Sequence, residues 1–338
     1  MKKAILLVNT GSPDSPKTKD VRCYLRRFLY NRRVINMPNI KRWILVNMVI
    51  AAFRAPKSAK LYKQLHTKNG FPLVYYGNSI KEKLQDIYKD NSDVYVAMSF
   101  GKPSIKNVLD IIKQNNYQHL TVLPLFPQYA SSSTGVVIEE FMDIVKKWTL
   151  IPQITIINSF YNNPLFIKAF AKRIKEYKPD DYDHVLFSYH GLPMSHIQQA
   201  CSSKNPCECE CEHTLSQQNP YCYKAACYET TRLIAQAAGL HEKDYSVGFQ
   251  SRMDKNWLQP YTDKLIVAKA RQGAKKLLVV APSFIADCLE TTIEIGFEYK
   301  KLFQEAGGHT LTLVESLNDS NEWIVALKDI IDNAGRYQ

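Results

Sequence analysis

Short runs of strand-forming residues alternate along this chain with longer stretches that have the periodicity of helices. Several runs, such as Leu277–Val280, lack polar alternation, which is typical of a sheet that is covered on both faces. The alternation predicts an α/β fold in which crossover helices connect parallel strands. The expected strands are Ile5–Val8, Val94–Met98, Leu120–Leu125, Thr155–Ile157, Val185–Ser188, Tyr245–Phe249, Leu277–Ala281 and Leu311–Val314.

A weak internal repeat indicates two similar lobes. Residues 148–152 interrupt the pattern, so we place an N-terminal lobe at 1–158 and a C-terminal lobe at 159–338, and we expect the last helix to pack back on the first lobe. Ligands of open α/β sheets bind beyond the carboxyl ends of the strands, so we expect the site in a cleft between the lobes. The matching segments, in the same order in each half, are Leu6–Pro13 and Leu186–Pro193, Tyr95–Gly101 and Tyr245–Ser251, and Leu123–Phe126 and Ala281–Phe284.

Basic residues are in excess, with 44 Lys and Arg against 32 Asp and Glu and a formal charge of +12. Such a surface favours anionic partners, namely nucleic acid, anionic lipid or carboxylated small molecules. The basic residues are scattered and no nucleic-acid-binding signature accompanies them, so nucleic acid is not expected as a partner.

The apolar stretches are too short for a signal peptide or a membrane-spanning helix. The first ends at Asn9, and Trp43–Phe53 contains Asn47 and falls well short of the roughly 20 residues that a spanning helix needs. We therefore expect a soluble, cytoplasmic protein whose contact with the inner face of an anionic membrane is at most peripheral.

A histidine directly follows one of the expected buried strands. Gly191 and Pro193 turn the chain beside His190, which would hold the imidazole rigidly at the lip of the sheet. There it can accept a proton or bind a metal. The alternative is a strand-end histidine that only hydrogen-bonds a loop.

Acidic residues recur at helical spacing after another expected strand. Asp287, Glu290, Glu294 and Glu298 are three, four and four residues apart, which places all four carboxylates on one helical face. Like charges at this spacing repel by a few tenths of a kcal/mol per pair, so the pattern indicates a compensating role in carrying metal ions or protons. The alternatives are a solvated helix face and, for Asp287, a simple preference for a helix N-terminus.

Six motifs, in order along nearly the whole chain, resemble those of the ferrochelatase family. They are Leu6–Pro13, Tyr24–Leu29, Leu123–Tyr129, the Ser-Tyr-His-Gly-Leu-Pro motif at 188–193, Phe249–Arg252 with Trp257–Asp263, and Phe284–Thr291. The resemblance implies two Rossmann-like, chelatase-type lobes, each with a parallel four-stranded sheet flanked by helices. It also implies a lyase that inserts Fe(II) into protoporphyrin IX to form haem, in the terminal step of haem biosynthesis.

The resemblance implies roles for individual residues. His190 and Glu290 would face each other across the porphyrin, with His190 accepting pyrrole protons or positioning the iron. Glu290 would relay metal or protons, with Asp287, Glu294 and Glu298 as an acidic track. A site that binds the bent ring better than the flat one would supply the distortion that insertion needs. The residues implied at the porphyrin cleft and its lip are Asn9, Trp43, Val46, Ile50, Phe53, Tyr129 and Ser188.

Two segments of the chain correspond to distinctive parts of the family pattern. Cys288 stands where animal-type members have a histidine, which puts in doubt only a mechanism that needs a second histidine there. The stretch Met37–Lys60 resembles the family's hydrophobic lip, whose apolar surface suits a flat ring and whose cations suit propionates or anionic lipid. An ordinary amphipathic core helix is the alternative for this stretch.

Six of the eight cysteines lie between Cys201 and Cys227. Disulfides are disfavoured because nothing suggests export, so metal ligation is the best interpretation. Zinc and a [2Fe–2S] cluster both accept four thiolates, and spacing does not separate them. The resemblance favours a [2Fe–2S] cluster, because some ferrochelatases carry one and this insertion, at about 198–227, follows the His190 loop. A thiol-rich, metal-handling loop without a fixed cluster is the alternative. The expected ligands are Cys201, Cys207, Cys222 and Cys227, with Cys209 and Cys211 as substitutes.

Three rival functions stay open on the sequence. The first is a chelatase for another tetrapyrrole, either coproporphyrin or a sirohydrochlorin-type ring. The second is a non-catalytic haem or metal carrier that uses the same fold. The third is an iron–sulfur electron-transfer protein, which would leave the His190 and Glu290 motifs unexplained.

Overall fold

The computed structural model describes residues 2–200, 210–212 and 219–334. The chain divides into two compact units, and each unit contains one parallel sheet. Unit 1 extends to Phe126 and from Ala130 to Ser159, and the end of the last helix, from Ile331, groups with it. Unit 2 comprises Pro127–Tyr129 and Phe160–Ile330.

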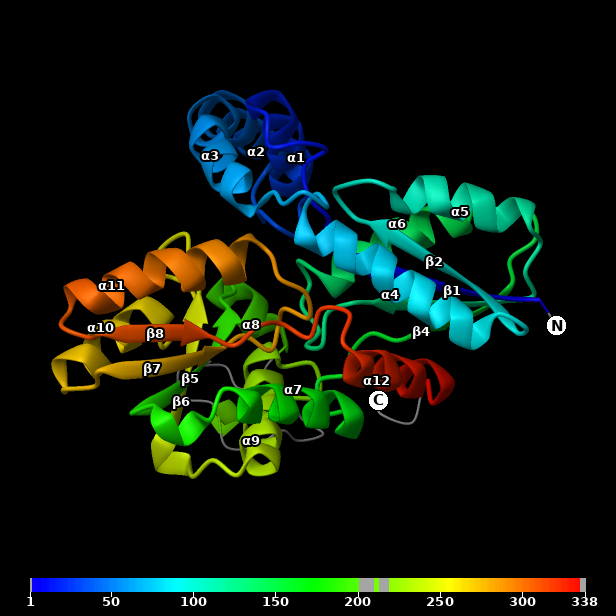
Figure 1. The fold of residues 1–338 in the computed structure, drawn as a ribbon. Helices are drawn as coiled ribbons and strands as arrows, with labels where there is room; N and C mark the ends of the chain where they lie inside the picture. Colours follow the sequence, from blue (N-terminus) through cyan, green and yellow to red (C-terminus); the bar gives the residue numbers. More distant parts are fainter. Residues whose placement is uncertain (1, 201–209, 213–218, 335–338) are drawn as a thin grey trace. The chain divides into compact units, whose positions relative to one another are not determined.

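Unit 1 has a four-stranded parallel sheet in the order β2-β1-β3-β4. Figure 1 labels β1, β2 and β4 of this sheet. The strands are β1 (Lys3–Asn9), β2 (Ser92–Met98), β3 (His119–Pro124) and β4 (Gln153–Ile156). The helices are α1 (Thr18–Tyr30), α2 (Asn39–Ile44), the π-helix η1 (Leu45–Arg54), α3 (Ala55–Leu65), α4 (Pro72–Tyr88), α5 (Ile105–Gln114) and α6 (Thr134–Val145).

Helices cover both faces of the first sheet, which explains why β1 is apolar from Ala4 to Val8. Successive side chains of a strand point to opposite faces. Leu6 and Val8 pack with α5 and α6 in one hydrophobic cluster. Helix α4 packs against β2 and β1 and buries Ile80 and Leu84.

Unit 2 repeats this topology, with parallel strands in the order β6-β5-β7-β8. The strands are β5 (His184–His190), β6 (Tyr245–Gln250), β7 (Lys276–Val280) and β8 (Thr310–Leu313). The helices are α7 (Pro164–Glu176), η2 (Pro179–Asp181), α8 (Met194–Ala200), η3 (Glu210–Glu212), α9 (Tyr223–Ala238), η4 (Glu242–Asp244), α10 (Thr262–Arg271), the π-helix η5 (Leu289–Tyr299), α11 (Lys300–Glu305) and α12 (Asn321–Asp332).

The second sheet is also covered on both faces. Leu186, Leu277 and Val279 form a hydrophobic cluster with residues of α10, η5 and α11. On the opposite face, the hydroxyl of Tyr189 shares a hydrogen bond with Thr231 of α9. Both sheets are therefore parallel and enclosed by helices, and the predicted α/β fold is confirmed, with every expected strand present.

Two helices, η1 and η5, have π-type rather than α-type hydrogen bonding. π-Helices are rare and occur frequently at functional sites. Within the described ranges, no helix has both the length and the apolar composition that crossing a bilayer requires.

Candidate functional site

The candidate residues of unit 2 gather at the carboxyl edge of its sheet. His190 ends β5 and Gln250 ends β6, and these two residues are paired in the parallel register. The neighbouring strand β7 continues through residues 281–288 into η5, which carries Glu290. Because carboxyl ends of adjacent parallel strands meet at one edge, residues separated by a hundred positions come together there.

His190 is held by its backbone and by its Nδ1 atom. The hydroxyl of Tyr223 donates to the His190 carbonyl oxygen at 2.8 Å, and Nδ1 lies 2.6 Å from the Gly191 carbonyl oxygen. A carbonyl can only accept, so in the neutral imidazole this contact assigns the proton to Nδ1 and the lone pair to Nε2. The rings of Trp257 and Phe284 lie at centroid distances of 6.3 Å from the imidazole. The half-buried His190 can therefore accept a proton or bind a metal through Nε2.

Gln250 connects the end of this strand pair to η5. Its side-chain oxygen accepts from Ser188 Oγ at 2.7 Å, and its Nε2 donates to the Glu290 carbonyl oxygen at 2.9 Å. The same Nε2 lies 3.2 Å from Glu294 Oε2. Both Gln250 and Ser188 are fully buried, so Ser188 supports Gln250 from within the sheet. This bridge holds the first turn of η5 against the strand that ends next to His190.

Glu294 is surrounded by hydrogen-bond donors. Its carboxylate accepts from the Ser251 amide at 3.0 Å, from the Ser251 hydroxyl, from Tyr299 Oη at 2.8 Å and from Gln250. Burial, reinforced by the negative charge of Glu294, raises the pKa of Tyr299, so its hydroxyl stays a donor. A carboxylate with these donors fastens the Ser251 turn to η5.

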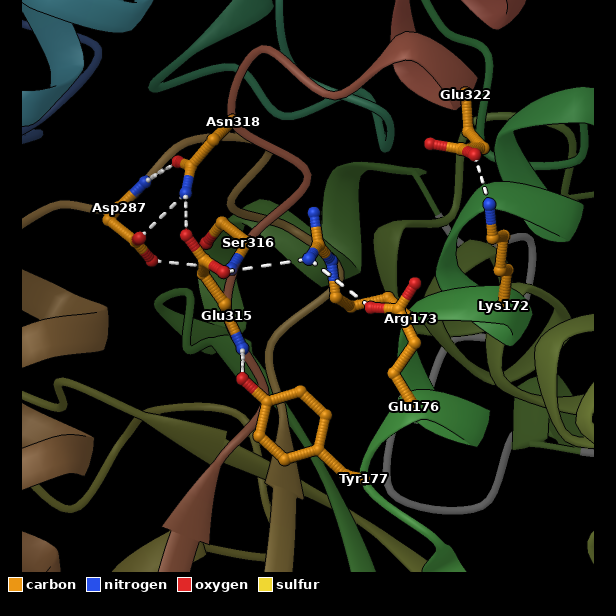
Figure 2. Close-up of polar contacts among 9 residues, drawn as sticks. All are labelled: Lys172, Arg173, Glu176, Tyr177, Asp287, Glu315, Ser316, Asn318 and Glu322. Carbon is orange, nitrogen blue, oxygen red and sulfur yellow. Dashed lines mark hydrogen bonds and ion pairs between the residues drawn. The ribbon is translucent and has the colours of Figure 1, made fainter.

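The remaining carboxylates have different surroundings. Glu298 is exposed near the end of η5, and desolvation together with the charge of Glu294 raises its pKa. Asp287 precedes the helix, because η5 begins at Leu289, and its side chain binds Asn318 and the Ser316 amide (Figure 2). The expectation that all four carboxylates share one helical face is therefore wrong for Asp287, which lies in the loop.

Cys288 caps the start of η5. Its amide donates to Thr291 Oγ1 at 2.9 Å, and its side chain is buried. Burial, with the nearby negative charge of Glu290, raises the pKa of the Cys288 thiol well above its ordinary value. The residue therefore stays a neutral thiol beside Glu290.

The cysteine-rich segment is only partly described. Cys201, Cys207 and Cys209 lie outside the described residues. Cys211, Cys222 and Cys227 are buried, and Asn219 Nδ2 donates to Cys211 Sγ at 3.3 Å. Cys222 is the N-cap of α9, and burial raises the pKa of Cys227, five residues further on. In the part of the chain that the structure describes, no three His, Cys, Asp or Glu side chains form a group that could hold a metal.

In unit 1, the expected porphyrin residues lie in two places. Asn9 ends β1, at the position equivalent to the end of β5 in unit 2, and its Oδ1 accepts from the Thr10 amide at 2.8 Å. In the stretch around η1, Trp43 is 52% and Phe53 is 74% exposed, whereas Val46 and Ile50 are 1% and 6% exposed. Helices α1 and α3 pack against η1, so Val46 and Ile50 contribute to packing, and Trp43 and Phe53 contribute exposed apolar surface.

Tyr129 groups with unit 2, where its ring makes an edge contact with Tyr221 at 5.9 Å between centroids. Sequence reasoning did not assign roles to Gln250, Tyr223 or Asn318, which hold the site through hydrogen bonds. The sequence does contain a signal for Gln250. It is a polar residue at the end of an expected buried strand, within the segment Tyr245–Ser251 that resembles Tyr95–Gly101.

The site combines a proton acceptor, His190, with a carboxylate, Glu290, at the carboxyl edge of the second sheet. The Nε2 lone pair of His190 and the side chain of Glu290 belong to elements that Gln250 fastens together. Nitrogen and carboxylate donors of this kind bind first-row transition metals and accept protons.

Comparison with known proteins identifies the family. A family model described as Ferrochelatase matches residues 2–334. A ferrochelatase of Legionella pneumophila (strain Lens) is 41% identical over 336 residues, which cover 98% of this chain and 99% of the relative. A ferrochelatase of Coxiella burnetii (strain Dugway 5J108-111) is 39% identical over 337 residues, which cover 96% of this chain and 92% of the relative.

Among solved structures, SirB from Bacillus subtilis with Fe3+ aligns with a TM-score of 0.53 over 100% of this chain and 99% of that chain. Its sequence identity is 13%, so it is similar in fold alone. The sequence matches, which span nearly the whole chain, are decisive: the chain belongs to the ferrochelatase family, the lyases of haem biosynthesis that insert iron into a porphyrin.

Proposed function

We propose that this enzyme inserts Fe(II) into protoporphyrin IX, in the terminal step of haem biosynthesis. One observation supports this proposal most strongly. His190 and the first turn of η5, which carries Glu290, lie at the same edge of the second sheet, and Gln250 links them. Insertion replaces two pyrrole protons with Fe(II) and releases both protons, so the enzyme must provide a proton acceptor and a route for the metal.

In the proposed mechanism, His190 accepts a pyrrole proton at Nε2, because Nδ1 is occupied by its contact with the Gly191 carbonyl. Glu290 receives the iron or the second proton at its carboxylate. Glu294 keeps η5 in place through its contacts with Ser251 and Tyr299, and Glu298 is the exposed end of the acidic track. Asp287 contributes to the acidic track indirectly, because it stabilises the loop that precedes η5.

The test is anaerobic insertion of Fe(II) into protoporphyrin by the unmodified enzyme, His190→Ala and Glu290→Gln. Because general acid–base groups contribute about 10²–10⁴-fold, both variants should lose at least a hundred-fold in kcat and still bind the porphyrin. The matched controls are His241→Ala and Glu305→Gln, which change exposed residues of the same types. Tight haem binding without insertion by the unmodified protein would instead indicate a carrier.

The choice of tetrapyrrole is part of the proposal. The exposed Trp43 and Phe53 support a weakly carboxylated ring, because more carboxylated rings favour a more polar surface. Insertion rates with protoporphyrin IX and coproporphyrin III, measured in parallel, should favour protoporphyrin. A faster reaction with coproporphyrin would reassign the substrate.

We also propose that the cysteine-rich segment holds a [2Fe–2S] cluster, with zinc as the alternative. The proposed ligands are Cys201, Cys207, Cys222 and Cys227, with Cys209 and Cys211 as substitutes. Cys222 and Cys227 fit because both are fully buried near the start of α9, and burial opposes an uncompensated thiolate at Cys227. When bound, such a centre would cross-link this segment to α9.

Visible absorption that dithionite bleaches, together with two irons per chain, is the expected result for the cluster. Cys227→Ser should abolish the absorption, and Cys23→Ser, which changes an exposed cysteine on α1, should preserve it. A colourless protein with one zinc per chain would replace the cluster by a zinc site.

We propose that the enzyme works in the cytoplasm and contacts the inner face of an anionic membrane only peripherally. The exposed apolar residues around η1 and the neighbouring cations Arg54 and Lys57 support such a contact.

A further inference from the structure

The loop of residues 281–288 decides where Glu290 lies, yet it has no regular secondary structure. It joins β7 to η5, and Ile285 and Ala286 within it are fully buried. Buried backbone groups need hydrogen-bond partners. Within the loop, the Phe284 amide donates to the Ala281 carbonyl oxygen at 3.1 Å. The partners of Ile285 and Asp287 come from residues 316–318, which follow β8.

Asn318 makes most of these contacts (Figure 2). Its amide donates to the Ile285 carbonyl oxygen at 2.8 Å. Its side-chain oxygen accepts from the Asp287 amide at 2.9 Å, and its Nδ2 donates to Asp287 Oδ2 at 2.8 Å and to Glu315 Oε1 at 3.0 Å. The Ser316 amide adds a contact to Asp287 Oδ1 at 3.3 Å. The buried Asn318 thus holds the loop on both sides of Ala286.

The contacts require an asparagine for two independent reasons. The φ angle of Asn318 is +50°, in the left-handed region that glycine and asparagine tolerate best. The side chain must also accept from one group and donate to two carboxylates, which only a carboxamide of this length can do. An aspartate would keep the acceptor and lose the donor.

The residues after β8 are themselves anchored to α7 and the turn that follows it. Glu315 pairs with Arg173 at 3.5 Å, and Arg173 also pairs with Glu176 at 3.3 Å. The Glu315 amide donates to the hydroxyl oxygen of Tyr177 at 3.2 Å. Figure 2 shows this continuous set of contacts from Arg173 through Glu315 and Asn318 to Asp287.

We propose that Asn318 is a positioning residue for Glu290, which acts by fixing the loop that carries Cys288 and starts η5. The proposal rests on the assignment of Glu290 to iron insertion. It gives Asp287 a structural task, since both of its carboxylate oxygens and its amide are engaged by residues 316–318. Loss of the Asn318 side chain should displace Glu290 without altering porphyrin binding.

The first test is Asn318→Gly, which keeps the left-handed backbone and the amide contact and removes the side chain. Misplacement of a reacting group by about 1 Å can cost on the order of a hundred-fold in rate. We expect kcat for iron insertion to fall about ten-fold or more, with KM for protoporphyrin unchanged. Assays should run well below the melting temperature of each variant.

The second test is Asn318→Asp, which has a pH signature. The titratable groups that face this position are Asp287 on one side and Glu315, with its partner Arg173, on the other. Clustered carboxylates raise the pKa of the proton that they share, and that proton restores a donor. The ratio of variant to unmodified kcat should therefore rise as the pH falls, and the same ratio for Asn318→Gly should stay flat.

Asn116→Gly is the matched control, because Asn116 also has a φ of +50° but is exposed in a turn of unit 1. It should leave kcat and KM unchanged. Amide hydrogen exchange gives a readout that does not depend on activity: peptides covering 285–291 should exchange faster in Asn318→Gly, and those covering β3 should not.

Unchanged exchange at 285–291, or an unchanged kcat in Asn318→Gly, would overturn the positioning role. Lack of iron insertion by the unmodified enzyme would count against the proposed function instead, and the exchange experiment would still decide whether Asn318 holds the loop.

Discussion

Strand β5 begins and ends with a histidine, and the two residues have opposite properties. His190, at the carboxyl end, is half-buried beside aromatic rings. His184, at the amino end, is buried and shares a 2.9 Å hydrogen bond through Nε2 with Ser246. Burial, with the positive charge of Lys269, lowers the pKa of His184 to about 4. At neutral pH His184 is therefore an uncharged part of the sheet.

The stability of unit 2 should reflect His184. The unfolded chain binds a proton at the ordinary pKa of 6.5, and the folded chain binds it only near 4. The unfolded state therefore gains protons as pH falls from 6.5 to 4, and the free energy of unfolding should decrease over this window, by on the order of 1 kcal/mol after solvent screening.

Urea unfolding of the unmodified chain and of His184→Gln, at pH 7.5, 5.5 and 4.5, measures this contribution. The unmodified chain should lose more stability than the variant as the pH falls. An equal loss in both chains would show that His184 does not titrate as described.

At the scale of elements, the close approach of two strand ends explains the glycine after His190. The Gly191 amide donates to the Gln250 carbonyl oxygen at 2.8 Å, and a Cβ atom on Gly191 would lie 2.8 Å from that same oxygen. Backbone on both sides leaves no flexible group that could move away. In η5, by contrast, a Cβ atom on Gly296 would meet its neighbours at ordinary contact distances of 3.6 and 3.7 Å.

Gly191→Ala should therefore lower the free energy of unfolding by about 1–3 kcal/mol, because the ends of β5 and β6 must separate. Gly296→Ala, the matched control, should be neutral or stabilising by about 0.5–1 kcal/mol, since alanine favours helices over glycine. Chemical denaturation measures both variants. Equal stability of the two alanine variants would contradict the close approach at Gly191.

At the scale of the whole molecule, a formal charge of +12 coexists with exposed apolar residues around η1. Basic groups are drawn to anionic lipid over distances set by the ionic strength, whereas apolar side chains act only on insertion. The combination is typical of reversible binding to a membrane surface.

Vesicles of phosphatidylglycerol and phosphatidylcholine should bind the protein at low salt, and vesicles of phosphatidylcholine alone should not. The double variant Trp43→Ser with Phe53→Ser should bind on the order of ten-fold more weakly, because it loses two aromatic anchors. Leu150→Ser, which changes a leucine that is 79% exposed elsewhere in unit 1, is the control. Equal sedimentation of all variants with anionic vesicles would show that Trp43 and Phe53 do not make the contact, and failure of the unmodified protein to sediment would remove the proposed membrane contact.

Much of this architecture could be predicted from the sequence, because it depends on local patterns. Apolar runs such as Leu277–Val280 indicate strands covered on both faces, and the order of motifs indicates the family. The position of His190 at a strand end also follows from residues next to it in the chain. These features depend on the periodicity and turn preferences of neighbouring residues, which the sequence displays directly.

Only the tertiary structure decided how distant polar residues pair. Gln250 meets Glu290 and Glu294, and Asn318 meets Asp287, because adjacent strands bring their following loops to one sheet edge. The start of η5 at Leu289, which removes Asp287 from the acidic face, follows from the same contacts. Such hydrogen bonds depend on strand order and on the exact path of loops, and no local pattern encodes either, so the chain must fold before its site residues acquire their partners.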